Sequence, residues 1–214
     1  MAADAGIRGQ PDPEREEGMI VFIDRQHAGK PNRVADRGAS RDLDGDGEIS
    51  AAEQEAIWTA RISIELEVLL TDMGISVMPI SDGRYADRHQ RVNSYTSMIP
   101  GPWIYLAMHL NAGGGKYGSY FHDHRSAAGA KLAAEMARQL ELSVDELETC
   151  KAIPANPDDW TKNAWYTIRG VGLPIAICCE PFFMDTHSSL LSLSGIGRVS
   201  TSMAVAIRNW RDRQ

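Results

Sequence analysis

Two histidines and a glutamate stand at the ends of three strongly apolar segments. The runs MIVFID and WIYLAM lead to His27 and His109, and the run PIAICC is followed at once by Glu180. Such nearly continuous apolar runs are typical of central strands covered on both faces. Ligands of open α/β sheets bind beyond the carboxyl ends of the strands, so we expect the three side chains to meet at one edge. Each of them alone is equally explained as a surface residue where its strand emerges.

Glu55 is a fourth candidate because the helix expected from about Ser50 to Met73 carries it on an apolar stripe. At about 100° per residue, Glu55 shares its face with the apolar residues Trp58, Ile62, Leu66, Leu69 and Met73. A carboxylate on the face that packs against the sheet needs a partner, since an unpaired buried charge is costly. Three interpretations stay open: an Arg or Lys partner, a position just before the buried part of the helix, or a metal ligand.

Two histidines and a glutamate with an open fourth position form a ligand set of catalytic zinc sites. Zinc in such a site polarises a carbonyl group and lowers the pKa of a bound water. Hydrolysis also needs a group that moves a proton, and a glutamate at a strand end suits that task. The hypothesis is therefore a zinc site made by His27, Glu55 and His109, with Glu180 as the general base.

The elements that must position these residues alternate between strand-like and helical patterns, which predicts an α/β domain. Strands are expected at Met19–Asp24, Ser76–Ile80, Trp103–Leu110, Gly118–His122, Trp165–Arg169 and Pro174–Glu180. Helices are expected at about Ser50–Met73, Ser126–Leu140 and Gly195–Trp210, with a short fourth helix starting at Ser143. The stretch Ala152–Ala164 is expected to be a long loop, and such loops in compact domains are often functional.

The 214 residues, 43% of them apolar and 24% charged, have the size and composition of one globular domain. The net charge of −7 excludes a basic stripe for nucleic acid and has the wrong sign for a polybasic membrane anchor. Residues 1–18, rich in charge, Pro and Gly, are expected to be a flexible tail rather than a signal peptide or a membrane span, which leaves 19–214 as the folded domain. Two of the three cysteines are adjacent in an apolar run, which favours a reducing compartment.

Residues 42–53, DLDGDGEISAAE, match the calcium-binding loop of an EF-hand at every position. The ligands expected from this match are Asp42, Asp44, Asp46, Glu48 through its backbone carbonyl, and Glu53. The alternative is a flexible acidic loop leading into a capping box of Ser50 and Glu53.

The spacing also suggests that the two metal sites are coupled. Glu53 and Glu55 lie two positions apart at the start of one expected helix, so they point about 200° apart. Calcium would hold Glu53 on the outer face while Glu55 turns inward to zinc. The hypothesis is that calcium fixes the start of this helix and thereby the zinc site.

The order of these motifs resembles the type-3 family of zinc-dependent N-acetylmuramoyl-L-alanine amidases, which includes catalytic domains of phage endolysins. The matching segments are FIDRQHAG (22–29), EAIWTARISIELEVLLTDMGISV (55–77), RHQRVN (88–93), IYLAMHLNAGGGKYGSYFH (104–122) and LPIAICCEPFFMD (173–185). The resemblance implies a twisted mixed, mostly parallel sheet with helices on both faces in a single domain. It also implies that His27, Glu55 and His109 bind zinc and that Glu180 is catalytic.

The sequence departs from the family pattern at Gln26, where the family usually has glycine. Gln26 either narrows the approach to the metal or adds a polar side chain at its rim.

The expected function is hydrolysis of the amide bond between N-acetylmuramic acid and L-alanine in peptidoglycan. The alternatives are a zinc peptidase that cuts within the stem peptide and a catalytically silent, calcium-stabilised wall-binding module. Asn111 is expected to orient the site through hydrogen bonds and Trp160 to stack on sugar rings. We expect a monomer that is made in the cytoplasm without a signal peptide and acts on the wall after release or as a virion-associated protein.

Overall fold

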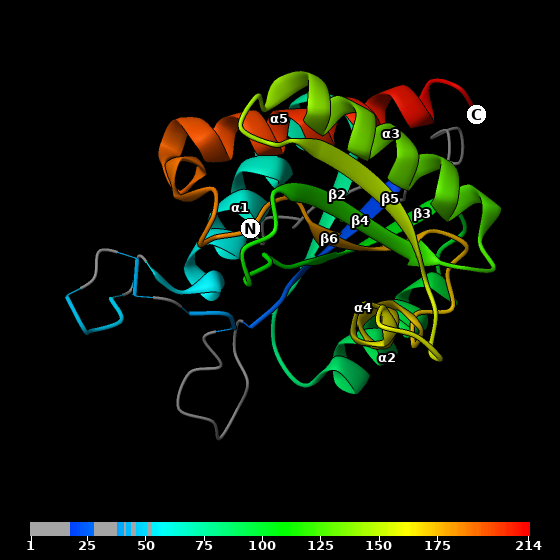
Figure 1. Cartoon of the computed structure of the whole chain (residues 1–214). Helices are drawn as coiled ribbons and strands as arrows, with labels where there is room; N and C mark the ends of the chain where they lie inside the picture. The colour runs from blue at the N-terminus through cyan, green and yellow to red at the C-terminus, as the bar shows by residue number, and fades with distance from the viewer. Residues whose placement is uncertain (1–17, 28–37, 41, 44–45, 51–52) are drawn as a thin grey trace, which may run out of the picture.

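The computed structural model describes residues 18–27, 38–40, 42–43, 46–50 and 53–214, so the expected tail lies almost entirely outside the described residues. A six-stranded sheet lies between two layers of helices (Figure 1). The strands are β1 (Ile20–Arg25), β2 (Ser76–Ile80), β3 (Trp103–Met108), β4 (Tyr117–Asp123), β5 (Thr149–Ala155) and β6 (Ala176–Glu180). The helices are α1 (Glu55–Asp72), α2 (Tyr85–Thr96), α3 (Ala127–Ser143), α4 (Lys162–Ile168) and α5 (Leu193–Arg211), with a 3-10 turn at Ser188–Leu190.

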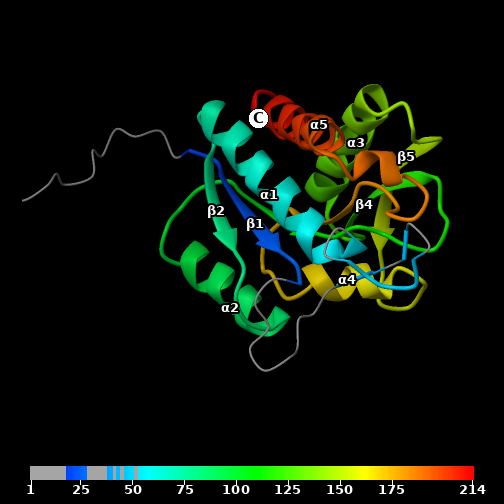
Figure 2. The same ribbon diagram turned by 90° about the vertical axis from the view of Figure 1, so that its left-hand side faces the viewer.

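The sheet is mixed and mostly parallel, as expected. Its strand order is β2-β1-β3-β6-β4-β5, and only the β4–β6 pairing is antiparallel among these six strands. Figure 2 shows the parallel course of β1 and β2. The register pairs Arg25 with Met108 and Met108 with Cys179. The carboxyl ends of β1, β3 and β6 therefore lie at one edge of the sheet, and the chain leaves β1 and β3 there.

Each face of the sheet has its own apolar core. Helices α1, α3 and α5 cover one face, and α2 and α4 cover the other (Figure 1). The stripe of α1 is buried against the sheet and α5 through Trp58, Ile62, Leu66 and Leu70. Full burial of a side chain of this size contributes about 1.5–3 kcal/mol, so the stripe fixes which face of α1 is turned inward. In the part of the chain that is described, no helix is both long and apolar enough to cross a membrane.

The strands expected near β1, β2, β3, β4 and β6 are confirmed within two residues at each end, as are the starts of α3 and α5. The first helix is shorter than expected, because it begins at Glu55 and not at Ser50. No helix starts at Ser143, which is the last residue of α3. The expected strand Trp165–Arg169 was wrong, and the expected loop Ala152–Ala164 is confirmed only at residues 156–161.

The reason for these two errors is that tertiary packing overrides weak local patterns at this edge of the sheet. Residues 149–155 form the edge strand β5, which pairs only with β4; Ala155 is its one buried residue, so the apolar signal of the strand is weak. Residues 162–168 form α4, whose Ala164, Thr167 and Ile168 are buried on the second core. Helix α2 gave no apolar stripe, since two of its three buried residues, Arg88 and His89, are polar.

A buried ion pair joins α2 to the end of β1. Arg88 and Asp24 are both fully buried, and Nη1 of Arg88 lies 3.0 Å from Oδ1 of Asp24. The hydroxyl of Tyr105 donates a hydrogen bond to the other oxygen of Asp24. Nη2 of Arg88 donates to Oε1 of Gln26 at 3.2 Å. The charge of Arg88 is thus compensated, and the segment that carries His27 is fastened to the helix layer below the sheet.

Replacing Arg88 tests this buried pair. Arg88→Met leaves the carboxylate of Asp24 buried without its cation, so we expect a loss of about 3–5 kcal/mol in the free energy of unfolding. The double variant Asp24→Asn with Arg88→Met should recover part of that loss. Arg198→Met, which breaks the exposed pair with Glu146, is the control and should cost less than about 1 kcal/mol. Urea unfolding with a chelator present measures all three; equal losses for Arg88→Met and Arg198→Met would contradict the account.

Candidate metal centre

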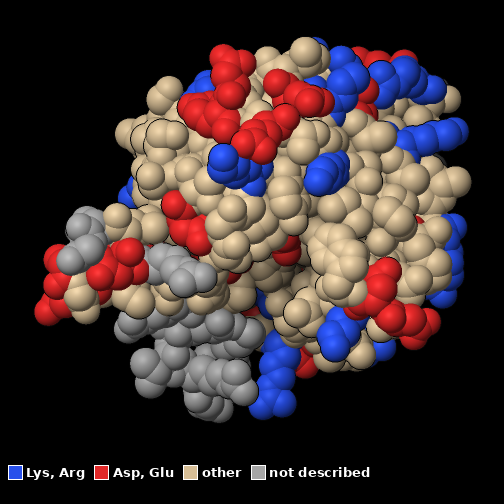
Figure 3. Space-filling model, in the orientation of Figure 1, with Lys and Arg blue, Asp and Glu red and all other residues tan. Residues whose placement is uncertain are grey.

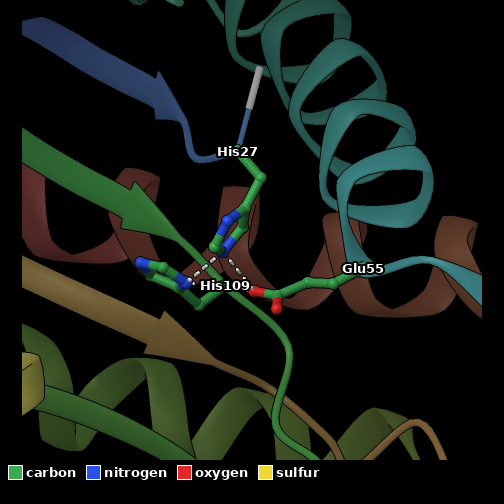
Figure 4. A group of neighbouring side chains, drawn as sticks. All are labelled: His27, Glu55 and His109. Carbon is green, nitrogen blue, oxygen red and sulfur yellow. Dashed lines mark hydrogen bonds and ion pairs between the residues drawn. The ribbon is translucent and has the colours of Figure 1, made fainter. Parts of the chain in front are cut away.

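Three side chains from distant parts of the sequence converge beyond the ends of β1 and β3 (Figure 4). His27 follows β1, Glu55 opens α1 and His109 follows β3. Nε2 of His27 lies 3.1 Å from Nδ1 of His109 and 3.1 Å from Oε1 of Glu55. Nδ1 of His109 lies 3.0 Å from the same oxygen. One donor atom of each residue therefore stands at a corner of a nearly equilateral triangle.

This triangle fits a zinc ion. A tetrahedral ion with bonds of about 2.0–2.1 Å holds its ligand atoms about 3.3 Å apart, close to the observed sides. The donor set of two imidazoles and a carboxylate is one that zinc takes in catalytic sites. Burial raises the pKa of Glu55, but hydrogen bonds from His109 and His27 outweigh burial and hold the pKa well below its usual range. Glu55 is therefore ionised, as a metal ligand must be.

Backbone amides fix the carboxylate of Glu55. Its Oε1 accepts a hydrogen bond from the amide of Leu110 at 3.0 Å, and its Oε2 accepts one from the amide of Ala39 at 2.7 Å. The amide of Glu55 in turn donates to the carbonyl of Ala39 at 2.9 Å. Among the described residues no Arg or Lys pairs with Glu55, which is 3% exposed. Among the described residues the structure therefore shows neither a basic partner nor an exposed position for Glu55, and its role as a metal ligand stays a prediction.

His27 has a left-handed backbone conformation, with φ of 65°. This region is unfavourable for a residue other than glycine, so the neighbouring structure must hold it. Gln26 contributes: it is 1% exposed, and its Oε1 accepts a hydrogen bond from the buried Arg88. Gln26 does not line the cavity over the metal site. Both interpretations of Gln26 from the sequence are therefore wrong, since the side chain points into the protein.

Gly38 belongs to the site, although nothing in the sequence marked it. Its φ is +66°, and a Cβ added there would lie 2.4 Å from Oε2 of Glu55 and 2.8 Å from Cδ2 of His27. Contacts this short do not occur for real Cβ atoms, so a side chain at position 38 would displace the two ligands. Gly38 is one of 19 glycines, and only the folded chain shows that it lies against the cluster.

Glu180 lies in the same cavity as the three ligands. The cavity has a volume of about 470 Å³. Figure 3 shows a hollow near the centre of the visible face, beside α1. Nδ2 of Asn111 donates a hydrogen bond to Oε2 of Glu180 at 2.6 Å. Burial, together with the charge of Glu55, raises the pKa of Glu180 to about 7, although His109 acts in the opposite direction. Glu180 can therefore accept and release a proton near neutral pH.

Asn111 is itself tied to the segment that follows Glu180. Its amide donates to the carbonyl of Phe182 at 3.1 Å, and its carbonyl accepts from the amide of Met184 at 2.9 Å. The side-chain bond to Glu180 is thus made from a fixed backbone. Substrate contact by Asn111 stays a prediction.

Trp160 does not line the cavity of the metal site. It is 69% exposed and contacts Phe121 edge to face, with ring centroids 6.0 Å apart. Two other aromatic residues, Tyr85 and Tyr166, line the cavity instead. The sequence did not single these out, because α2 and α4, which carry them, were not expected. Stacking of Trp160 on sugars stays a prediction.

The expected calcium ligands are described in part, since Asp44 lies outside the described residues. A side-chain oxygen of Asp42 accepts a hydrogen bond from the amide of Gly47, and Asp46 accepts one from the amide of Glu48. The carboxylate of Glu53 accepts from the amides of Leu43 and Ser50.

The expectation that Glu53 faces outward on the helix was wrong. Glu53 is 4% exposed and precedes α1, which begins two residues later. Its bond from the amide of Ser50 is one half of the capping box that the sequence suggested, but the N-cap of α1 is Gln54.

Comparison of the sequence with protein-family models and with curated proteins gives no match. Solved structures share the fold. The chain superposes on Cwp6 from Clostridium difficile with a TM-score of 0.68 and 20% identity, covering 90% of this chain and 29% of Cwp6. It superposes on the N-acetylmuramoyl-L-alanine amidase from Clostridium difficile 630 with a TM-score of 0.69 and 16% identity, covering 93% and 100% of the two chains. For the catalytic domain of the CD27L endolysin targeting Clostridium difficile, the TM-score is 0.56 at 16% identity, over 88% and 97%.

The chain thus spans less than a third of Cwp6 and nearly the whole of the other two proteins. These superpositions establish a common fold, and sequence identities this low establish nothing more.

Gly38→Ala tests whether the space beside the ligands is needed for metal binding. The added methyl group meets Glu55 and His27, so we expect zinc affinity to fall at least about 10-fold, the loss typical when support of a metal ligand is disturbed. Gly74→Ala is a matched control, since Gly74 also has a positive φ of 71° but no atom within 4 Å of an added Cβ. Competition of each metal-free variant with a chromogenic zinc chelator measures the affinity. Equal affinities in the two variants would show that zinc binding does not need the space beside the ligands.

Proposed function

We propose that the protein hydrolyses the amide bond between N-acetylmuramic acid and L-alanine in peptidoglycan, with zinc held by His27, Glu55 and His109. The observation that carries the proposal is the triangle of donor atoms that shares one cavity with Glu180. The fold, which the chain shares with an N-acetylmuramoyl-L-alanine amidase, supports the choice of substrate. Action as a monomer, on the wall after release from the cytoplasm or as a virion-associated protein, is part of the proposal.

The residues have separate roles in this reaction. Zinc, when bound, polarises the amide carbonyl and lowers the pKa of a water molecule. Glu180 accepts a proton from the attacking water, whose oxygen bonds to the carbonyl carbon. Glu180 then gives that proton to the leaving nitrogen as the carbon–nitrogen bond breaks. Asn111 keeps the carboxylate of Glu180 in place through its side-chain amide.

The state of Glu180 favours an enzyme over a silent wall-binding module. In the described structure the carboxylate contacts no Arg or Lys, and burial raises its pKa to about 7. Such a group weakens the fold at neutral pH, and perturbed acids of this kind cluster at catalytic sites. A peptidase that cuts within the stem is the remaining alternative, and the reaction products separate it from an amidase.

Glu180→Gln tests the catalytic role. The amide cannot accept a proton, so we expect hydrolysis of purified peptidoglycan to fall by about 10²–10⁴-fold while zinc content stays at the wild-type level. Mass spectrometry of the wild-type digest should show intact stems with new free L-alanine amino groups. Glu141→Gln, an exposed glutamate of α3, is the control. Cleavage between residues of the stem would show that the protein is a peptidase and not an amidase. An active Glu180→Gln variant would show that Glu180 has no part in the mechanism.

The same variant gives a pH test of the metal-free protein. The pKa of Glu180 is about 7 in the folded state and 4.5 ordinarily, so the folded protein binds this proton more tightly than the unfolded chain. Stability due to this proton is present below pH 4.5 and is lost as the pH rises to 7, by up to about 3 kcal/mol. Urea unfolding across this range should show that the wild type loses stability relative to Glu180→Gln. Parallel profiles would contradict the raised pKa.

We also propose that residues 42–53 bind calcium and that this loop supports the zinc site. Support comes from the match of every position to an EF-hand loop and from the bond between Asp42 and the amide of Gly47. The loop is closed by a bridge between Ser40 and Gln54, next to the bond from Ala39 to Glu55. A change in the conformation of the loop can therefore move the carboxylate of Glu55 through Ser40 and Ala39.

Glu53→Gln tests this coupling. Loss of the bidentate carboxylate should weaken calcium binding at least about 10-fold, and it should lower zinc affinity when calcium is present. Glu48→Gln is the matched control, because that position ligates through its backbone carbonyl and its side chain is exposed. Isothermal titration with each ion measures both affinities. If saturating calcium leaves the zinc affinity of the wild type unchanged, the sites are independent.

A further inference from the structure

A second cavity, larger than that of the metal site, lies between α2 and α4. Its volume is about 810 Å³, within the range of about 300–1,000 Å³ that is usual for ligand sites. Tyr85 and Tyr166 line this cavity and also the cavity of the metal site. The two cavities therefore adjoin at these tyrosines, and a chain that leaves the metal site past them enters the second cavity.

Hydrogen bonds hold the walls of this cavity at a fixed distance. Nδ2 of Asn93 on α2 donates to the carbonyl of Gly170 at 2.9 Å, and its Oδ1 accepts from the amide of Gly172 at 2.8 Å. Nε2 of His89 lies 2.9 Å from the carbonyl of Thr167. Gly170 packs so closely that an added Cβ would lie 2.2 Å from Nδ1 of His89. These contacts join α2 to the end of α4 and to the residues that follow it, so the fold fixes the width of the cavity.

The lining of the cavity selects for a negatively charged, polar ligand. Of the described residues, Arg169 is the one charged residue that lines it, and no Asp or Glu of that part of the chain does so. Burial lowers the pKa of His89, so its ring is neutral at pH 7. The other polar lining residues carry hydroxyl and amide groups: Tyr85, Gln90, Asn93 and Ser94 on α2, Ser97 just after it, and Tyr166 on α4.

Arg169 is oriented by aromatic rings and not by an acid. Its guanidinium carbon lies 4.3 Å from the ring centroid of Tyr166 and 4.8 Å from that of Trp165. It forms no ion pair with an acid among the described residues, so its charge is available to a ligand. A guanidinium stacked in this way presents planar donors that match a carboxylate.

We propose that the cavity between α2 and α4 is the subsite for the stem peptide and that Arg169 binds a carboxylate of the stem. This inference rests on the proposed function, which places the scissile amide at the metal site. The N-acetylated sugars on one side of that amide are uncharged, whereas the stem on the other side carries carboxylates. Arg169 therefore favours the peptide as the occupant, and the glycan extends from the opposite side of the metal site.

Binding of the released stem peptide tests the inference without catalysis. The probe is the tripeptide L-alanyl-γ-D-glutamyl-L-lysine, compared with the same tripeptide whose carboxylates are amidated. Isothermal titration is performed on the protein with zinc and on the metal-free protein. Arg169→Gln should weaken binding of the acidic peptide by about 10–100-fold, the range for a hydrogen bond to a charged group. It should leave binding of the amidated peptide unchanged, and Arg169→Lys should fall between Arg169→Gln and the wild type.

Arg61→Gln is the matched control, because Arg61 is also exposed and stacks on an aromatic ring, Trp58, at 4.6 Å, but on α1. It should bind both peptides as the wild type does. The inference is overturned if neither form of the wild type binds the acidic peptide, or if Arg169→Gln weakens both peptides equally. It is also overturned if a neutral oligomer of N-acetylglucosamine binds and loses affinity in Arg169→Gln.

The outcome separates this inference from the proposed function. If the acidic peptide binds through Arg169 but peptidoglycan is not hydrolysed at the amide, only the proposed function fails. If the amide is hydrolysed and Arg169→Gln leaves both peptide affinity and KM unchanged, only the subsite fails.

Discussion

The carboxylate of Glu55 is the point at which three separate parts of the chain are joined. A buried carboxylate is tolerated only where its charge is compensated, and Glu55 meets this demand with the two histidines and the amides of Ala39 and Leu110. These partners come from the end of β1, the end of β3 and the segment before the acidic loop. The same bonds that stabilise the charge therefore bring the donor atoms to the spacing that zinc requires. The start of α1 and the path of residues 38–40 follow from this single requirement.

Two carboxylates in one cavity have pKa values that are shifted in opposite directions. The pKa of Glu55 lies below its usual range because two histidines bind it, whereas the pKa of Glu180 rises to about 7 because burial is not offset by a cation. Environments that separate the pKa values of neighbouring acids commonly mark their different tasks. Glu55 thus suits permanent ligation, and Glu180 suits the uptake and release of a proton.

The two helices α2 and α4, which cover the same face of the sheet, position two arginines with different roles. The sequence does not distinguish these arginines. On α2, Arg88 is fully buried and holds the turn that carries His27, through Asp24 and Gln26. At the end of α4, Arg169 is exposed, is stacked on aromatic rings and lines a cavity. One arginine stabilises the site from within, and the other is available to a ligand. The difference arises from packing, since neither residue lies in an apolar stripe that would show its depth.

The sequence by itself determined the α/β class, the central strands and the residues at their ends. Continuous apolar runs end next to His109 and Glu180 because a buried strand must be apolar along its length, and a polar residue marks where it emerges. The apolar stripe of α1 likewise placed Glu55 on the inward face. The tertiary structure alone decided that these side chains meet, that Gly38 leaves room for them and that Gln26 points inward. It also decided that α2 and α4 enclose a second cavity. Local periodicity reports which face of a segment avoids water, but the distance between two segments depends on how the whole chain closes, and buried polar pairs carry no periodic signal.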